Sequence, residues 1–167
     1  MVIVASRPAV LASIEGMNMT HWHFEDAQIG AIHKAGRYLV SKEEIIQFAK
    51  QYDPLPIHVD EEAAAHSIFG GLIASSSHTF AIFTSLSPKL QPRLSILAGL
   101  GWDELRLPSP VRPGDELELE AIVLEKRESK SKPNRGIVRF QIRLRNQRNE
   151  IVLQCISNLL VARRPSP

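Results

Sequence analysis

The chain has 167 residues, which is enough for one domain but not for two complete hydrophobic cores. Hydrophobic residues make up 44% of it and charged residues 23%, a composition typical of a folded globular protein and not of a disordered one. The formal net charge of +2 comes from lysines and arginines scattered among acidic residues, without the basic stripe that nucleic-acid binding requires. We therefore expect a single domain with no nucleic-acid partner.

A single cysteine, Cys155, cannot form an intramolecular disulfide and has no companion at metal-ligand spacing. Its apolar surroundings favour the role of a small buried hydrophobic residue over that of a nucleophile. No apolar stretch approaches the roughly 18 residues of a membrane helix, and the N-terminal apolar run is too short for a signal peptide. These features predict a cytoplasmic protein without a membrane partner, with residues 1–18 as a loose extension, 19–164 as the domain and 165–167 as a tail.

Residues 41–52 carry the first clear helix signal. Ser41 and Glu44 have the spacing of a capping box, in which the serine accepts a hydrogen bond from the first turn and the glutamate reaches back. An apolar face follows, and Pro54 disfavours helical geometry at Asp53. The pattern predicts a helix that ends near residue 52.

The following segment predicts a stiff loop and two further helices. Prolines make residues 53–58 extended, and Asp60 can cap a short helix over 61–66 before a glycine pair ends it. Residues 72–86 are apolar or small almost throughout and carry no charge. A helix of that kind belongs inside a protein.

The last third of the chain predicts strands separated by turns. The segment 137–144 alternates strictly between apolar and polar residues, as a sheet with one buried face requires, and 117–124 and 151–161 lie on either side of it. Strands joined by short turns pair antiparallel, and their buried face needs a cover. The apolar helix, about 15 residues long, is the candidate cover. We therefore expect an α+β protein with a single hot-dog domain, in which a curved antiparallel β-sheet wraps around a central apolar α-helix.

Several motifs resemble, in the same order, the MaoC-like dehydratase family, which includes the (R)-specific enoyl-CoA hydratases. An aspartate is followed five residues later by a histidine, and then come an acidic residue, an alanine-rich segment and a Phe-Gly-Gly motif that opens the apolar helix. The residues concerned are Asp53, His58, Asp60, 63–65 and 69–74. The resemblance continues through 101–106 and 110–115, and covers about residues 19 to 164. It implies the hot-dog fold and activity on acyl thioesters in fatty acid metabolism.

Asp53 and His58 are the predicted catalytic pair. Adding water to a double bond conjugated with a thioester requires that water loses a proton and that the α-carbon gains one. A carboxylate and an imidazole on one stiff loop can share these tasks. The family resemblance implies that the two side chains hold the catalytic water together and deliver water and proton to one face of the substrate.

Stabilisation of the thioester oxygen is expected at the start of the apolar helix, where free N–H groups favour negative charge. By resemblance, the backbone N–H of Ser76 is the oxyanion donor, and Gly71 and Ser75 contact the substrate. The sequence departs from the family because Ser76 replaces a common glycine and Leu55 occupies a position that is often Asn or Gln. These departures are compatible with an altered substrate or with lost activity.

Other polar residues receive structural interpretations. His66 and His78 lack a partner at ligand spacing, so we expect no metal site and assign them surface and helix-packing roles. No elbow motif surrounds the serines at 75–77, which favours close helix packing over a serine nucleophile. Trp102 is expected in the core or in a pocket wall. No cofactor is expected beyond the CoA that forms part of the substrate.

Coenzyme A carries phosphates that favour basic residues, and the densest basic turn, at 130–136, contains Lys132 and Arg135. A solvated turn is the competing interpretation. A domain of this size has little surface to enclose a long CoA ligand, which, together with the family resemblance, predicts a homodimer with the site near the interface.

The leading hypothesis is reversible hydration of a 2-enoyl-CoA to a (R)-3-hydroxyacyl-CoA by Asp53 and His58. Hot-dog thioesterases use a carboxylate and a helix N-terminus on the same scaffold but generally lack this Asp-to-His spacing. A non-catalytic acyl-CoA-binding protein is the third alternative, consistent with Leu55 and the serine run.

Overall fold

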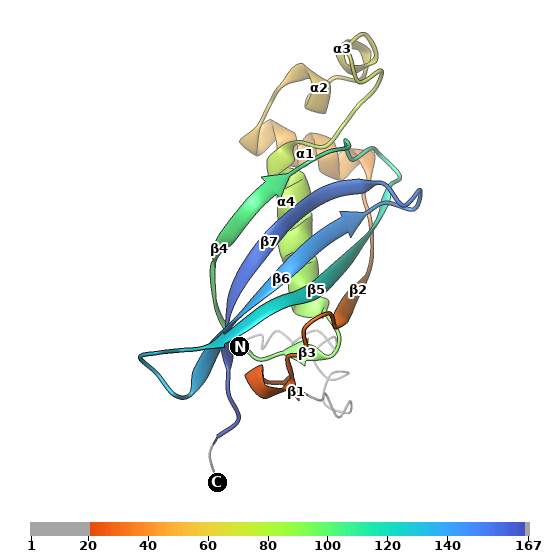
Figure 1. The fold of residues 1–167 in the computed structure, drawn as a ribbon. Helices are drawn as coiled ribbons and strands as arrows, with labels where there is room; N and C mark the ends of the chain where they lie inside the picture. The colour runs from red at the N-terminus through yellow and green to blue at the C-terminus, as the bar shows by residue number, and fades with distance from the viewer. Residues whose placement is uncertain (1–20, 166–167) are drawn as a thin grey trace, which may run out of the picture.

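The computed structural model describes residues 21–165, so the predicted extension at 1–18 lies outside the described part of the chain. Five antiparallel strands form a curved sheet in the order β2-β5-β6-β7-β4, and helix α4 lies against its inner face (Figure 1). The sheet strands are β2 (Ile32–Leu39), β4 (Ile96–Arg106), β5 (Glu116–Glu128), β6 (Arg135–Arg145) and β7 (Ile151–Ala162). The predicted α+β arrangement, a curved sheet around a central apolar helix, is confirmed.

Alternating side chains give the sheet its buried face. Along β6, Val138, Phe140, Ile142 and Leu144 are all buried, and the residues between them are partly exposed. β6 lies between β5 and β7 in antiparallel register, as the short turns in the sequence predict. Cys155 of β7 is buried in the same core, which confirms its assignment as a small hydrophobic residue, and burial raises the pKa of its thiol to about 11.

The central helix α4 (Ser76–Leu86) is shorter than the segment 72–86 predicted from the sequence. Its N-cap is Ser75, whose Oγ accepts a hydrogen bond from the N–H of His78 at 3.1 Å. The preceding residues are extended because the N–H of Ile73 bonds the carbonyl of Ile57 and the N–H of Ala74 bonds that of Val111. An apolar pattern without charge indicates burial, but it does not distinguish a buried helix from a buried extended segment.

Three helices lie at the end of the sheet where α4 begins: α1 (Lys42–Tyr52), α2 (Pro56–Val59) and α3 (Glu61–Ala65) (Figure 1). α1 has the predicted bounds, and Ser41 caps it by accepting from the N–H of Glu44 at 3.1 Å. The second half of the predicted capping box does not form, because the Glu44 carboxylate points to His78 and Tyr38 instead.

The loop after α1 is extended only as far as Leu55, so the prediction of an extended segment over 53–58 is wrong in its second half. Pro56 occupies the first turn of α2, where a missing N–H and a fixed φ cost nothing. Asp60 caps α3 as predicted, accepting from the N–H groups of Glu62 and Ala63. This helical turn rotates the side chain of His58 inward.

Three strands carried no clear signal in the sequence. Strand β2 pairs with β5 and forms one edge of the sheet, although its sequence contains a glycine and the two basic residues Lys34 and Arg37. The short strands β1 (His21–Trp22) and β3 (Arg93–Leu94) pair in parallel below the open end of the barrel-like sheet (Figure 1). They join 3-10 helices η2 (Phe24–Asp26) and η3 (Ser87–Lys89) in closing the lower end of the core.

Candidate active site

The predicted catalytic pair lies where α1 ends and α2 begins. Asp53 is the C-cap of α1, and its N–H bonds the carbonyl of Ala49 at 2.8 Å. His58 follows within α2 and is 5% exposed. Its Nε2 lies 3.8 Å from Oδ2 of Asp53, whose side chain is 33% exposed. The structure thus brings together the two side chains that the spacing in the sequence singled out.

The hydrogen bonding of His58 determines which ring nitrogen faces the aspartate. Its Nδ1 lies 2.8 Å from the carbonyl oxygen of Ile73, which can only accept a hydrogen bond. Nδ1 therefore carries the proton, and in the neutral ring Nε2 has a free lone pair directed toward Asp53. A separation of 3.8 Å is too long for a direct hydrogen bond but allows both groups to bind one water molecule.

Asp53 and His58 line a cavity of about 370 Å³. Its walls come from the α1–α2 loop, from the segment leading into α4 and from residues 107–111. Apart from Asp53 and His58, the lining is mostly apolar. The lining residues are Asp53, Leu55, Ile57, His58, Phe69, Ile73, Ala74, Ser76, Thr79, Leu107, Pro108, Ser109, Pro110 and Val111.

Ser76, the predicted oxyanion donor, is the first residue of α4 and lines this cavity. N–H groups in the first turn of a helix have no partner within the helix, and the helix dipole favours negative charge there. The Oγ of Ser75 takes the N–H of His78, so it does not compete for that of Ser76. The cavity therefore combines a carboxylate, an imidazole and a helix N-terminus.

The other predicted contact residues lie farther from this cavity. Ser75 is 1% exposed and serves as the helix cap, and it is not among the lining residues. Gly71 is also outside the lining and lies against the Arg112 guanidinium, with Nη1 3.5 Å from where a Cβ would be. Among the residues near the site, Thr79 and Arg112 were missed by the sequence interpretation. The basic residue of the 110–115 motif was the available signal for Arg112.

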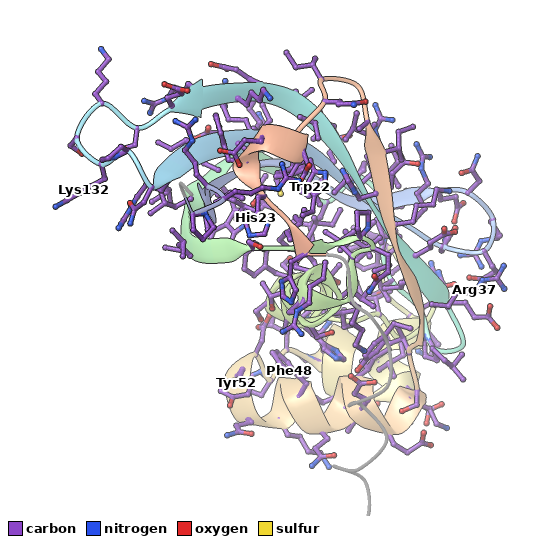
Figure 2. The ribbon with its side chains drawn as sticks, turned by 90° about the horizontal axis from the view of Figure 1, so that it is seen from below. Trp22, His23, Arg37, Phe48, Tyr52 and Lys132 are labelled. Carbon is purple, nitrogen blue, oxygen red and sulfur yellow. The ribbon has the colours of Figure 1, made fainter. Side chains whose placement is uncertain are left out.

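The predicted CoA-phosphate turn is not near the catalytic pair within one chain. Lys132 lies at the tip of the β5–β6 hairpin, at the far side of the molecule from Phe48 and Tyr52 of α1 (Figure 2). Arg135 lines a different cavity together with Glu25 and Arg163. The structure therefore does not bring the turn together with Asp53 and His58.

A second histidine–carboxylate pair connects α1 with α4. Nε2 of His78 lies 3.0 Å from Oε1 of Glu44, and the hydroxyl of Tyr38 donates to the same carboxylate oxygen. The His78 ring stacks on Phe48, with centroids 4.5 Å apart and planes at 11°. His78 is 2% exposed, which confirms its predicted role in helix packing. His66, by contrast, is exposed.

A second cavity, of about 360 Å³, lies between the C-terminal half of α4 and the sheet. Its lining is mainly apolar and includes Phe83 of α4 and Trp102 of β4. Trp102 packs edge-on against Phe80 with ring centroids 4.9 Å apart, so it forms part of a pocket wall as the sequence suggested. Phe83 lies one helical turn beyond Thr79, a residue that lines the first cavity.

Within residues 21–165, no three His, Cys, Asp or Glu side chains gather as metal ligands. None of the helices in that part of the chain is long and apolar enough to cross a membrane.

Comparison with known proteins gave consistent matches. The family model for the MaoC like domain matches residues 26–142. The uncharacterized protein YdeM of Bacillus subtilis (strain 168) is 32% identical over 142 residues, which cover 83% of this chain and 98% of that protein.

Solved structures agree with these matches. The MaoC-like dehydratase from Rhodospirillum rubrum is 42% identical with a TM-score of 0.79, over 87% of this chain and 99% of that one. The R-hydratase PhaJ1 from Pseudomonas aeruginosa shares the fold with a TM-score of 0.66 and 24% identity, over 87% and 92% of the two chains.

Proposed function

Because the chain belongs to the MaoC-like domain family, we propose that it is a hydro-lyase that interconverts a trans-2-enoyl-CoA and a (R)-3-hydroxyacyl-CoA. One observation carries the proposal. The Nε2 lone pair of His58 and the Asp53 carboxylate face each other at 3.8 Å in a largely apolar cavity that also reaches the N-terminus of α4. The R-hydratase PhaJ1, which has the same fold, is consistent with it.

The chemistry follows from the positions of these groups. A water molecule between Asp53 and His58 can donate one O–H to the Oδ2 lone pair and the other to Nε2, which leaves its oxygen free to attack the β-carbon. The hydroxyl group bonds to the β-carbon, one water proton moves to the pair, and the pair returns a proton to the α-carbon. Since Asp53 and His58 hold the same water molecule, water and proton reach the same face of the double bond.

The thioester oxygen gains negative charge when the β-carbon is attacked. A hydrogen bond from the backbone N–H of Ser76 can stabilise this charge, and the dipole of α4 acts in the same direction. The side chain of Ser76 leaves the backbone N–H donor in place, although it leaves less space than a glycine would for the thioester to approach that N–H. The acyl chain then follows α4 from Thr79 toward Phe83 into the second cavity, where apolar side chains can bury it.

The protein is proposed to act as a homodimer formed through β4. This strand is one of the two edges of the sheet, and its free backbone groups can pair with another strand. Its side chains are exposed along nearly the whole strand, including Leu97 at 50%, Leu100 at 51% and Trp102 at 46%. An apolar sheet edge of this kind fits a second copy of the same surface. Sedimentation equilibrium should give a dimer, and Leu100→Lys should yield a monomer; a monomeric wild type contradicts the proposal.

The function is tested by incubating the purified protein with crotonyl-CoA and following the absorbance of the conjugated double bond. A parallel assay for free thiol uses saturated acyl-CoAs. Hydration without thiol release supports the proposal. Thiol release without hydration indicates a thioesterase, and binding without either reaction indicates a non-catalytic acyl-CoA-binding protein.

A further inference from the structure

Arg112 lies at the border of the Asp53–His58 cavity. Its Nη2 donates to the carbonyl oxygen of Phe69 at 2.7 Å, and Phe69 lines the cavity. Val111, which precedes Arg112 in the chain, also lines the cavity. Its carbonyl accepts a hydrogen bond from the N–H of Ala74, just before α4. The guanidinium therefore covers the turn at residues 69–71, beside the cavity walls.

Among residues 21–165, no carboxylate oxygen lies within 4.0 Å of the Arg112 guanidinium, although its charge helps to lower the pKa of the Glu150 carboxyl. The nearby Arg148 differs, since it pairs with both Asp115 and Glu150. Arg112 is also partly buried, and its bond to Phe69 occupies only one of five N–H donors. A partly desolvated guanidinium with free donors suits a phosphate, which it can bind through two parallel hydrogen bonds.

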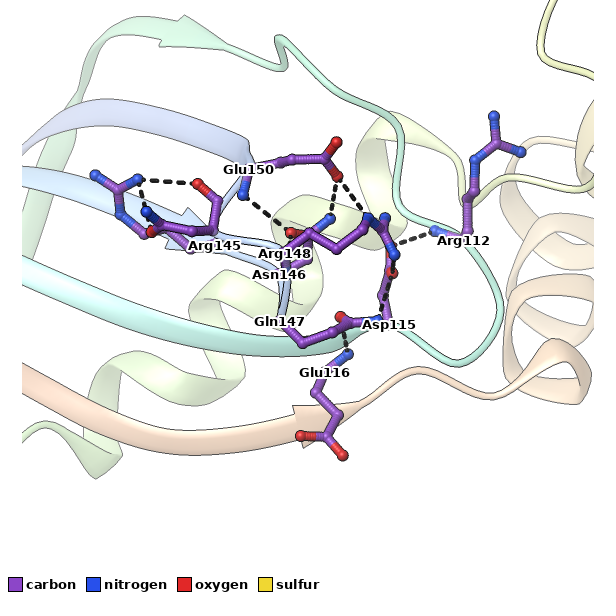
Figure 3. A network of polar contacts seen from close by, with 9 residues as sticks. Arg112, Asp115, Glu116, Arg145, Asn146, Gln147, Arg148 and Glu150 are labelled. Carbon is purple, nitrogen blue, oxygen red and sulfur yellow. Dashed lines mark hydrogen bonds and ion pairs between the residues drawn. The ribbon is translucent and has the colours of Figure 1, made fainter.

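A network of polar contacts holds the Arg112 backbone, and none of the contacts drawn there involves the Arg112 guanidinium (Figure 3). The carboxylate of Asp115, a residue 1% exposed, accepts from the N–H of Arg112 at 2.8 Å. Its charge is balanced by Arg148 at 3.1 Å, and Gln147 donates to it at 3.3 Å. Figure 3 shows the Arg112 side chain leading away from this network. Asp115 thus holds the backbone at Arg112 without forming an ion pair with the Arg112 guanidinium.

We propose that Arg112 binds a phosphate group of the substrate's pantetheine arm at the mouth of the site. The inference rests on the proposed acyl-thioester function and replaces Lys132 and Arg135 as the phosphate contact within the chain. The 4′-phosphate occurs both in CoA and in the prosthetic arm of an acyl carrier protein, and CoA carries further phosphates on its nucleotide.

Calorimetric titration of the full chain tests the proposal without requiring turnover. The probes are CoA, 4′-phosphopantetheine and pantetheine. The variants are Arg112→Gln and, as a control that removes two basic charges elsewhere, the double variant Lys132→Ala/Arg135→Ala. We expect Arg112→Gln to weaken CoA binding about tenfold or more, the loss typical of a charge-assisted hydrogen bond, and to leave pantetheine binding unchanged. The double variant should bind all three probes as the wild type does.

The pattern of losses identifies the phosphate. An equal loss for CoA and 4′-phosphopantetheine supports the proposal. A loss for CoA alone assigns Arg112 to a nucleotide phosphate and overturns its assignment to the pantetheine arm. Unchanged CoA binding, or an equal loss for pantetheine, overturns the proposal. Arg112→Lys keeps the charge and should retain more of the CoA affinity than Arg112→Gln, which separates charge from misfolding. Phosphate-dependent binding without hydration would refute the hydratase and leave this site standing.

Discussion

Two histidines of this protein lie beside carboxylates in nearly dry surroundings, His58 with Asp53 and His78 with Glu44. Their exposed fractions are 5% and 2%, and the shorter contact, 3.0 Å against 3.8 Å, belongs to His78. Burial and a carboxylate neighbour would thus select His78 as readily as His58. The cavity distinguishes them, since His58 lines it and His78 does not.

The two rings also differ in the nitrogen that carries the proton. The carbonyl of Ile73 holds the proton on Nδ1 of His58 and leaves Nε2 facing Asp53 and the cavity. In His78 the proton lies on Nε2, toward Glu44, and the buried Nδ1 has no hydrogen-bond partner among the described residues. A lone pair that faces an open cavity can accept a proton from a bound reactant, whereas one enclosed by protein cannot.

The largest expected effect is on turnover, which should depend on His58 and not on His78. His58→Gln should lower the rate of crotonyl-CoA hydration about a hundredfold or more, as for a positioned acid–base group. His78→Gln should change it by less than about threefold, because that ring does not line the cavity. Circular dichroism and thermal unfolding check that both variants fold. A similar loss of hydration rate in both variants would contradict the proposed difference between the Asp53–His58 and Glu44–His78 pairs.

Stability should show the opposite order for the two carboxylates. Glu44→Ala removes the hydrogen-bond partner of buried His78 and should lower the free energy of unfolding by about 1–3 kcal/mol. Asp53→Asn, at a partly exposed position, should lower it by less than about 0.5 kcal/mol. Urea unfolding measures both, and Glu43→Ala, an exposed change in the same helical turn, is the control. Equal destabilisation by Glu44→Ala and Glu43→Ala would show that the His78 contact adds nothing.

The smallest expected effect is on the pH dependence of stability and concerns Tyr38, whose hydroxyl also bonds the Glu44 carboxylate. Burial, together with its hydrogen bond to the Glu44 carboxylate, raises the pKa of Tyr38 to about 12, against about 10 in an unfolded chain. The raised pKa contributes stability that is complete below pH 10 and is lost as the pH rises toward 12. Tyr38→Phe should therefore flatten the alkaline decline of unfolding free energy. The exposed Tyr52→Phe serves as the control and should leave this decline unchanged.

Much of the architecture was predictable because it depends on local patterns. Alternating residues marked β6, turns on either side of it delimited β5 and β7, and Ser41 with Pro54 marked both ends of α1. Strand β2 was missed because its apolar residues do not alternate with polar ones along the strand, and pairing with β5 stabilises it instead. The length of α4 was overestimated because extended residues before it are as apolar as the helix.

The sequence by itself determined the single domain, the central apolar helix, the pairing of Asp53 with His58 and, through resemblance, the family. These depend on composition, on periodicity and on residues close together in the chain. Only the tertiary structure decided that the Ile73 carbonyl orients His58, that Glu44 binds His78 instead of its own helix end, and that Arg112 and not the 130–136 turn lies beside the cavity. Each of these contacts joins residues far apart in the chain, and a local pattern contains no information about which distant groups the fold brings into hydrogen-bonding distance.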